Sequence, residues 1–108
     1  MPKDSFLITD YKDRQIRLTD ERLNHIVKKH SEMANMKLAI QDTLVNPDVV
    51  RKSRTDNSVY LYYKYFEGTV VGNKWLCTLV KYLENDAFVI TAYLTDKLKQ
   101  GEQVWPSL

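Results

Sequence analysis

The chain has 108 residues, of which 44% are hydrophobic and 28% are charged, so it suffices for one domain with a modest core and has the composition of an ordinary globular protein. Two domains, global disorder and a fibrous repeat are excluded. Sixteen basic and fourteen acidic residues leave a net charge of only +2, which excludes a surface that attracts nucleic acid as a whole, so any anion-binding site must be local.

The first part of the chain predicts two helices. Residues 6–9 and 15–18 are read as short strands or as an extended entry segment. Thr19 is a suitable N-cap, and Asp20 and Glu21 favour the positive end of the helix that it would start. Apolar residues and one histidine then recur at helical spacing: Leu23, Ile26, Val27, His30 and Met33.

A second helix is predicted from about Met36 to Leu44, with Ile40 and Thr43 on its buried side, and Asn46-Pro47 stops it. After Asp48 the apolar period falls to two, which predicts strands joined by hairpin turns. The four apolar runs cover residues 49–53, 59–66, 75–83 and 88–94.

We therefore expect an α+β domain in which two N-terminal helices pack on one face of a four-stranded antiparallel meander and leave its other face free. Residues 95–108 are expected to form a short cap. Cys77, the single cysteine, excludes an intrachain disulfide, and its alternation with Trp75 and Leu79 indicates a small buried hydrophobe without a chemical role. The sequence shows no signal or membrane segment, which predicts a cytoplasmic protein.

Several polar residues fall at positions that stability alone does not explain. Lys81 lies in an apolar strand, His25 and His30 share one helix, and Thr91 and Tyr93 lie in the last predicted strand. An imidazole, an ammonium and hydroxyl groups together suit phosphate chemistry without a metal ion. No cluster of acidic, histidine or cysteine side chains has metal-ligand spacing, so neither a metal nor another cofactor is expected.

The two histidines cannot face the same place from a straight helix. At 100° per residue His30 falls in the apolar stripe, whereas His25 lies roughly opposite, with Lys28 and Lys29. His30 is thus predicted to face the sheet near the helix C-terminus, where the dipole favours imidazolium. The alternative is a core histidine that bonds a backbone group.

Strand register decides whether Lys81 joins Thr91 and Tyr93. A three-residue loop, Glu84-Asn85-Asp86, would pair Lys81 with Val89 and place its side chain on the face of Thr91. A two-residue loop would move Lys81 to the other face, and the proposed site would be lost. We expect the three-residue loop, because two-residue loops favour Asn-Gly or Asp-Gly. Phe88, Ile90, Ala92 and Leu94 are then the expected core set, and the alternative for Lys81 is a strand-end lysine that extends to water.

In its motifs and their order the chain resembles the phage-associated branch, called PBECR, of the barnase, EndoU, colicin and RelE-like ribonucleases. The resemblance covers residues 17–101, nearly the whole chain, and Ser31 stands where that family has proline. It is carried by Arg17-Leu18-Thr19, His25-Ile26, His30-Ser31-Glu32, Asn46-Pro47-Asp48, Leu61-Tyr62-Tyr63-Lys64, Val80-Lys81 and residues 88–95.

The resemblance implies metal-independent endonucleolytic cleavage of RNA, in which the 2′-hydroxyl attacks the phosphate and leaves a cyclic phosphate. His30 would be the first choice as general acid or base and His25, kept only through the family pattern, the second. Lys81 would stabilise the phosphorane, and Thr91 and Tyr93 would hold the phosphate.

Further residues are expected to bind the substrate. Arg17 enters through the family motif alone, Tyr63 and Lys64 through the aromatic and basic mixture of residues 60–66, and Arg51 through the basic run at residues 51–54. Core packing of the aromatic residues and a solvated charge run are the alternatives.

The expected partner is single-stranded or looped RNA, and a cytoplasmic ribonuclease of phage or toxin type would also need a protein inhibitor or another restraint. Two non-catalytic alternatives remain: an RNA-binding module that has lost proton chemistry, and a partner-binding accessory domain of phage particles. No membrane partner is expected, and the oligomeric state is not indicated.

Overall fold

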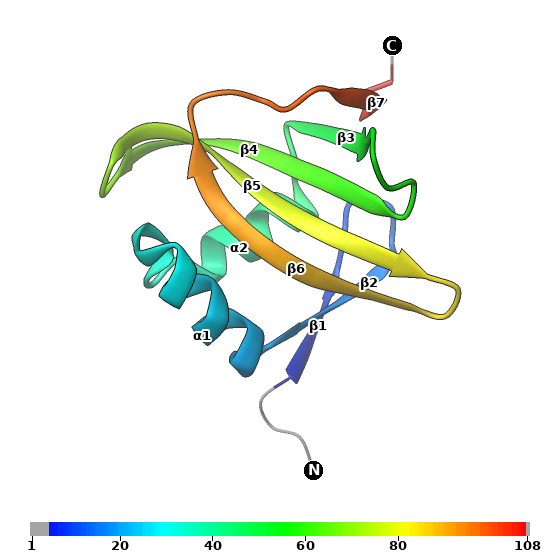
Figure 1. Cartoon of the computed structure of the whole chain (residues 1–108), viewed down its shortest axis with the longest axis horizontal. Coiled ribbons are helices and arrows are strands. Elements are labelled where there is room, and N and C mark those ends of the chain that lie inside the picture. The colour runs from blue at the N-terminus through cyan, green and yellow to red at the C-terminus, as the bar shows by residue number, and fades with distance from the viewer. Residues whose placement is uncertain (1–4, 108) are drawn as a thin grey trace.

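The computed structural model describes residues 5–107 and shows an α+β fold in which two α-helices pack on a seven-stranded, mostly antiparallel sheet (Figure 1). The strands lie in the order β1-β2-β6-β5-β4-β3-β7, and the described pairs are antiparallel except for β2 with β6. The elements are β1 (Ser5–Thr9), β2 (Gln15–Thr19), α1 (Asp20–Lys29), the 3-10 helix η1 (Ser31–Met33), α2 (Lys37–Val45), β3 (Val49–Ser53), β4 (Val59–Thr69), β5 (Gly72–Leu83), β6 (Asp86–Thr95) and β7 (Gly101–Trp105).

The predicted four-stranded meander is wrong, although its four strands are present as β3 to β6. Three further strands extend the sheet: β1 and β2 form a hairpin whose second strand joins β6 at Arg17↔Phe88, and β7 adds to β3. The tail is therefore a strand as well as a cap. Gly101 allows this pairing, since a Cβ there would lie 2.5 Å from the carbonyl oxygen of Lys52.

Both helices begin close to the predicted residues, and α2 also ends close to them. The side chain of Thr19 accepts a hydrogen bond from the backbone N–H of Arg22, at 3.0 Å, which confirms the predicted N-cap of α1. The first helix ends earlier than the apolar spacing indicated, at Lys29, and Met33 is buried from η1 instead. Neither helix, nor any other helical segment in residues 5–107, has the length and apolar character needed to cross a bilayer.

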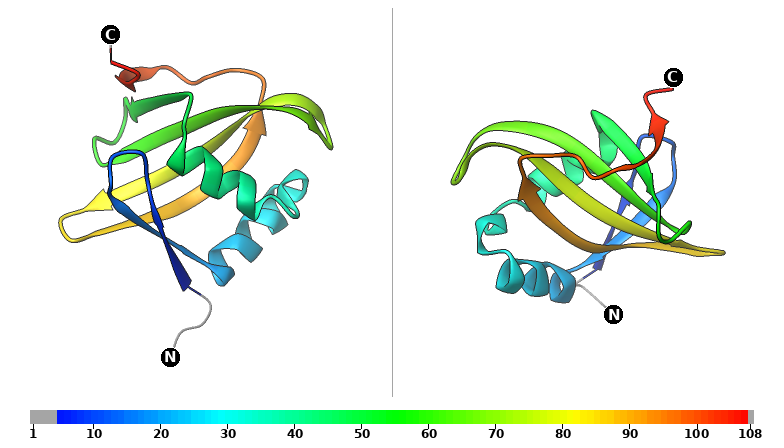
Figure 2. Two further views of the ribbon diagram at one scale, coloured as in Figure 1. Left: turned by 180° about the vertical axis from the view of Figure 1, so that it is seen from behind. Right: turned by 45° about the horizontal axis from the view of Figure 1, so that its top comes forward.

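The sheet has two covered faces. The face that carries both helices, here called the inner face, forms the main core, which joins the apolar side of α1 and α2 to Tyr62, Leu76, Val80 and Ala92. The opposite or outer face has a smaller cluster of Leu61, Tyr63 and Cys77, with Val49, Trp75, Leu79, Tyr93 and Leu98 packed against it. Residues 96–100, which join β6 to β7, run across this outer face (Figure 2). The outer face is thus not fully free, contrary to the expectation.

The β5–β6 hairpin combines a two-residue loop with a β-bulge. Leu83 pairs with Asp86, so the predicted three-residue loop is wrong, and Lys81 pairs with Phe88 instead of Val89. Farther along, Leu79 pairs with Thr91 while Val80 pairs with Val89, which leaves Ile90 as an extra residue. The bulge shifts the alternation by one residue, so half of the expected core set is confirmed and half is wrong. Ala92 is buried and Leu94 packs on the main core, whereas Ala87 and Val89 take the buried places expected for Phe88 and Ile90, which are only partly buried.

Candidate functional site

The bulge places Lys81, Thr91 and Tyr93 on the same face of the sheet after all. Along β5, Cys77, Leu79 and Lys81 alternate onto the outer face, and their antiparallel partners on β6 are Tyr93, Thr91 and Phe88. Neighbouring levels of this ladder are about 7 Å apart, because each strand residue advances about 3.3 Å. The three predicted residues therefore follow one another along the outer face without forming a single tight cluster.

His30 reaches this face from the end of α1. Its backbone N–H closes the helix by donating to the carbonyl of Ile26, at 2.7 Å, and the chain then turns into η1. The imidazole ring lies 5.6 Å from the ring of Tyr93, centroid to centroid, and is tilted by 42°. Its Nδ1 is 3.9 Å from a carboxylate oxygen of Glu32, and 35% of the side chain remains exposed. The prediction that His30 faces the sheet is confirmed.

Tyr93 supplies its ring to the surface but not its hydroxyl. The oxygen is buried in the outer-face cluster and has no hydrogen-bond partner among the described residues. Burial, with the neighbouring Cys77 thiol, raises the pKa of this phenol. In this arrangement the Tyr93 hydroxyl cannot contact a phosphate at the surface. Of the two threonines of β6, Thr91 is partly exposed, whereas the Thr95 hydroxyl donates to the Lys97 carbonyl.

Lys81 is held by an acidic side chain of the β3–β4 loop. Its ammonium donates to the Asp56 carboxylate at 2.9 Å, and about a third of the side chain is exposed. Hydrogen bonds from Ser58 and from Lys81 hold the pKa of Asp56 well below its ordinary value. The lysine is thus neither a buried core residue nor a free surface charge, and one carboxylate fixes where its charge lies.

Arg17 lies in the same row of the sheet as Lys81. It pairs with Phe88 across the parallel β2–β6 contact, and its guanidinium lies 5.5 Å from the centre of the Phe88 ring. It also donates to Asp86, at 2.7 Å, and this hydrogen bond lowers the pKa of Asp86. Two cations, Arg17 and Lys81, therefore flank one aromatic ring at the β5–β6 hairpin end of the outer face.

Three other predicted residues lie away from this arrangement. His25 is exposed on α1 beside Thr19, Glu21 and Arg22. Lys64 lies in the middle of β4 on the inner face, where its ammonium donates to the Asn46 carbonyl at 2.9 Å. Tyr63 is fully buried, and its hydroxyl accepts a hydrogen bond from the backbone N–H of Lys99. None of the three can join His30 and Lys81 at one substrate without rearrangement.

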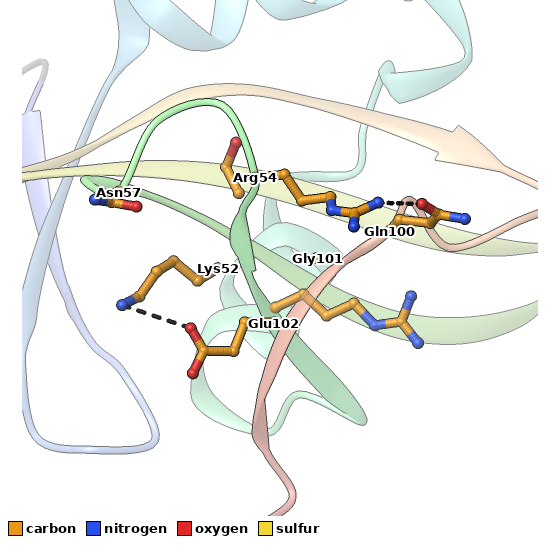
Figure 3. Close-up of a pocket in the computed structure, with 8 residues that line it drawn as sticks. Lys52, Arg54, Asn57, Gln100, Gly101 and Glu102 are labelled. Carbon is orange, nitrogen blue, oxygen red and sulfur yellow. Dashed lines mark hydrogen bonds and ion pairs between the residues drawn. The ribbon is translucent and has the colours of Figure 1, made fainter.

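Residues 96–100 form a strap over the middle of the outer face. Leu98 packs on the Cys77 cluster, the Lys99 carbonyl accepts a hydrogen bond from Arg51 at 2.8 Å, and Gln100 accepts one from Arg54. Figure 3 shows the Arg54–Gln100 contact beside an open depression that is lined by both basic and acidic side chains. Arg51, predicted to bind substrate, is thus engaged in holding the strap, and its Nε atom is buried without a partner in the described structure.

We expect Leu98→Ala to loosen the strap and expose Cys77. Burial raises the pKa of the Cys77 thiol to about 11, so the native protein should react slowly with thiol reagents. Loss of roughly 1–2 kcal/mol of apolar contact should speed modification of Cys77 about tenfold under native conditions. The rate is measured with a chromogenic disulfide, and Leu38→Ala, at a side chain that is 76% exposed on α2, is the control. An unchanged rate would show that the thiol becomes accessible by another route.

Sequence reasoning missed a buried polar network on the inner side of the sheet. The Asp10 side chain is fully buried and accepts hydrogen bonds from the backbone N–H groups of Lys12 and Arg14, from the Arg14 guanidinium and from Tyr62. The hydroxyl of Tyr82 contacts both Tyr62 and Asp10. The sequence carries one sign of this network: Asp10 directly follows a strand and precedes Arg14 by four residues. Every oxygen of this carboxylate is satisfied, which identifies the network as an anchor for the β1–β2 hairpin.

The arrangement contains no obvious metal centre, since no three acidic, histidine or cysteine side chains within residues 5–107 gather closely enough. No protein-family model matches the chain, and no curated protein or solved structure is significantly similar to it. The candidate site therefore rests on its own geometry: a partly exposed imidazole at one end of the outer face, a hydroxyl in the middle and two cations at the other end.

Proposed function

We propose that the chain is a metal-independent endoribonuclease that binds RNA along the outer face of its sheet and cleaves it beside His30. The single observation that carries this proposal is the meeting of His30 with β6. A partly exposed imidazole lies against the Tyr93 ring, on the face that Thr91 and Lys81 share. The order of the sequence motifs, which resembles the PBECR ribonucleases, supports the same conclusion independently of this geometry.

The proposed reaction needs little more than proton transfer and positive charge. The Glu32 carboxylate lies 3.9 Å from Nδ1, beyond hydrogen-bond distance, and its negative charge would stabilise the imidazolium that forms when Nε2 takes a proton. His30 would remove the proton from the 2′-hydroxyl, the 2′-oxygen would bond to phosphorus, and the departing 5′-oxygen would take a proton from water. Thr91 would donate a hydrogen bond to the phosphate. Arg17 and Lys81 are too far along the strands to share that phosphate, and would neutralise neighbouring phosphates of the same strand.

A non-catalytic RNA-binding module is the second candidate, and two observations favour it. The Tyr93 hydroxyl is buried, and the second histidine, His25, lies away from the face. Such a module would keep the cations and the exposed rings and lack the cleavage step.

The test is incubation of purified protein with end-labelled single-stranded RNA in excess chelator, followed by identification of the product ends. Products with 2′,3′-cyclic phosphate are expected. Binding of RNA without any cleavage, over varied sequences, would establish the binding module instead, and absence of both would reject the outer face as an RNA site.

Lys81→Ala should weaken RNA binding in a salt-dependent way. An ammonium that contacts a single-stranded phosphate contributes about 0.7 to the slope of log K against log salt concentration, and this contribution should be lost. Lys64→Ala is the matched control, because Lys64 alternates with Tyr63 along β4 onto the inner face and bonds the Asn46 carbonyl there. Binding isotherms at four salt concentrations, with RNA that carries 2′-O-methyl groups, give the slopes. Equal slopes for the two variants would place the RNA elsewhere.

A further inference from the structure

We propose that Tyr65 and Trp75 form a stacking subsite for one unpaired base, next to the His30 end of the outer face. This inference rests on the proposed function and specifies it further: the substrate is RNA whose bases are free to leave the helix stack.

The two rings form a cross-strand pair on β4 and β5. Tyr65 pairs directly with Trp75, their ring centroids are 5.2 Å apart, and the rings meet at 66°. The Tyr63 ring lies 6.4 Å from Trp75, nearly perpendicular to it, and supports the indole from the buried cluster. Tyr65 is nevertheless 44% exposed. The pair is thus held against the buried cluster, and Tyr65 is its exposed member, while Trp75 is half-buried.

The subsite is continuous with the proposed cleavage centre. Along β5 the next outer-face residue after Trp75 is Cys77, which pairs with Tyr93, and Tyr93 contacts His30. Trp75 is therefore about 7 Å along the strand from the level of the histidine. The ammonium of Lys99 lies 5.6 Å from the centre of the Tyr93 ring, so a cation accompanies the rings. The rings suit the base of a nucleotide, and the cation suits its phosphate.

Exposed aromatic side chains on a sheet bind bases of single strands, because every base has an open π-face once it is unstacked. A base inside a duplex is stacked on both sides and offers no such face. A cross-strand aromatic pair also stabilises a hairpin by packing alone. The two explanations differ in one measurable respect, which is whether the indole senses a bound base.

The experiment follows the fluorescence of Trp75 alone. The chain has two tryptophans, and Trp105→Phe leaves Trp75 as the single reporter, since Trp105 contacts Tyr11 and Pro47 on another part of the surface. The titrants are a 2′-O-methyl hexanucleotide, which binds without being cleaved, the same backbone without bases at its central positions, and a short RNA duplex. Tyr65→Ala and Tyr65→Phe are compared in this background, with thermal unfolding to verify the fold.

Saturable quenching is expected with the single strand, with little or none for the abasic strand and the duplex. Tyr65→Ala should weaken binding roughly 10- to 100-fold, whereas Tyr65→Phe, which keeps the ring, should bind like the parent. Equal quenching by the abasic strand, or equal affinity of the alanine variant, would overturn the subsite. Cleavage with no response of Trp75 would overturn the subsite and leave the proposed nuclease intact. Quenching with no cleavage would retain the subsite and reject the nuclease.

Discussion

Asp10→Ala is expected to destabilise the protein by about 3–5 kcal/mol, because several donors would lose their acceptor and each buried donor left unsatisfied costs about 1–3 kcal/mol. The carboxylate is fully buried and bonds Arg14 and Tyr62, so its loss leaves a guanidinium and a phenol without their acceptor. It also frees the turn between β1 and β2, since the same carboxylate accepts from two backbone N–H groups. Chemical denaturation at pH 7 measures the change.

Two controls separate the network from a general effect of lost charge. Glu84→Ala removes an exposed carboxylate from the β5–β6 turn and should change stability by less than about 0.5 kcal/mol. Tyr62→Phe removes a single donor to Asp10 and should cost about 1–3 kcal/mol. If Asp10→Ala costs no more than Glu84→Ala, the network contributes nothing to stability.

The pH dependence of the same network has a definite sign. Burial alone would raise the pKa of Asp10, but hydrogen bonds from Tyr62, Arg14 and Lys12, together with the Arg14 charge, lower it below its ordinary value. A carboxylate with a lowered folded-state pKa stabilises the fold above its unfolded pKa of about 3.9, and this stability is lost as the pH falls through the folded value. Asp10→Asn should therefore lose less stability than the parent between pH 4 and pH 2.

The helices could be predicted because local sequence determines them. Thr19 caps α1, and Ile40, Thr43 and Leu44 are buried on α2 as their spacing indicated. The sheet could be predicted only in part. The strand reading of residues 6–9 and 15–18 is confirmed by β1 and β2. Their place in the sheet and the strand β7 were not predicted, because both depend on distant partners: the Asp10 network holds the first hairpin, and the close approach at Gly101 admits β7. Neither partner is visible in a local pattern.

The candidate site, too, could be predicted only where local sequence determines it. His30 contacts the sheet as expected, but it does so as the C-cap residue that follows the last residue of α1, so helical spacing alone does not determine its direction. Lys81 and Thr91 share a face through two errors that compensate: the loop is one residue shorter than expected, and a bulge at Ile90 restores the alternation. The burial of Tyr63 and of the Tyr93 hydroxyl depends on Leu98, because the strap of residues 96–100 closes over them. The alternation of apolar residues along a strand does not show that a later segment of the chain covers one of its faces.

The proposed mechanism predicts that His30→Ala lowers the rate of RNA cleavage about 10²- to 10⁴-fold, the range that a positioned general acid or base contributes. The imidazole is 35% exposed and lies against Tyr93, so its removal should leave the core intact. Single-turnover cleavage of end-labelled RNA measures the rate. The affinity for a 2′-O-methyl RNA should change little, because the His30 imidazole transfers a proton and contributes little to the free energy of binding.

His25→Ala is the matched control for that loss. Both histidines belong to α1 or its C-terminal cap, yet His25 is exposed on the helix surface and has no described contact with β6. The His25 variant should cleave RNA at the rate of the parent. Glu32→Gln keeps the size of the side chain but removes the charge beside Nδ1, and it should reduce the rate less than His30→Ala does. A loss with His25→Ala and not with His30→Ala would move the reaction from the sheet face to the helix surface. The outer face would then be a binding surface without proton chemistry.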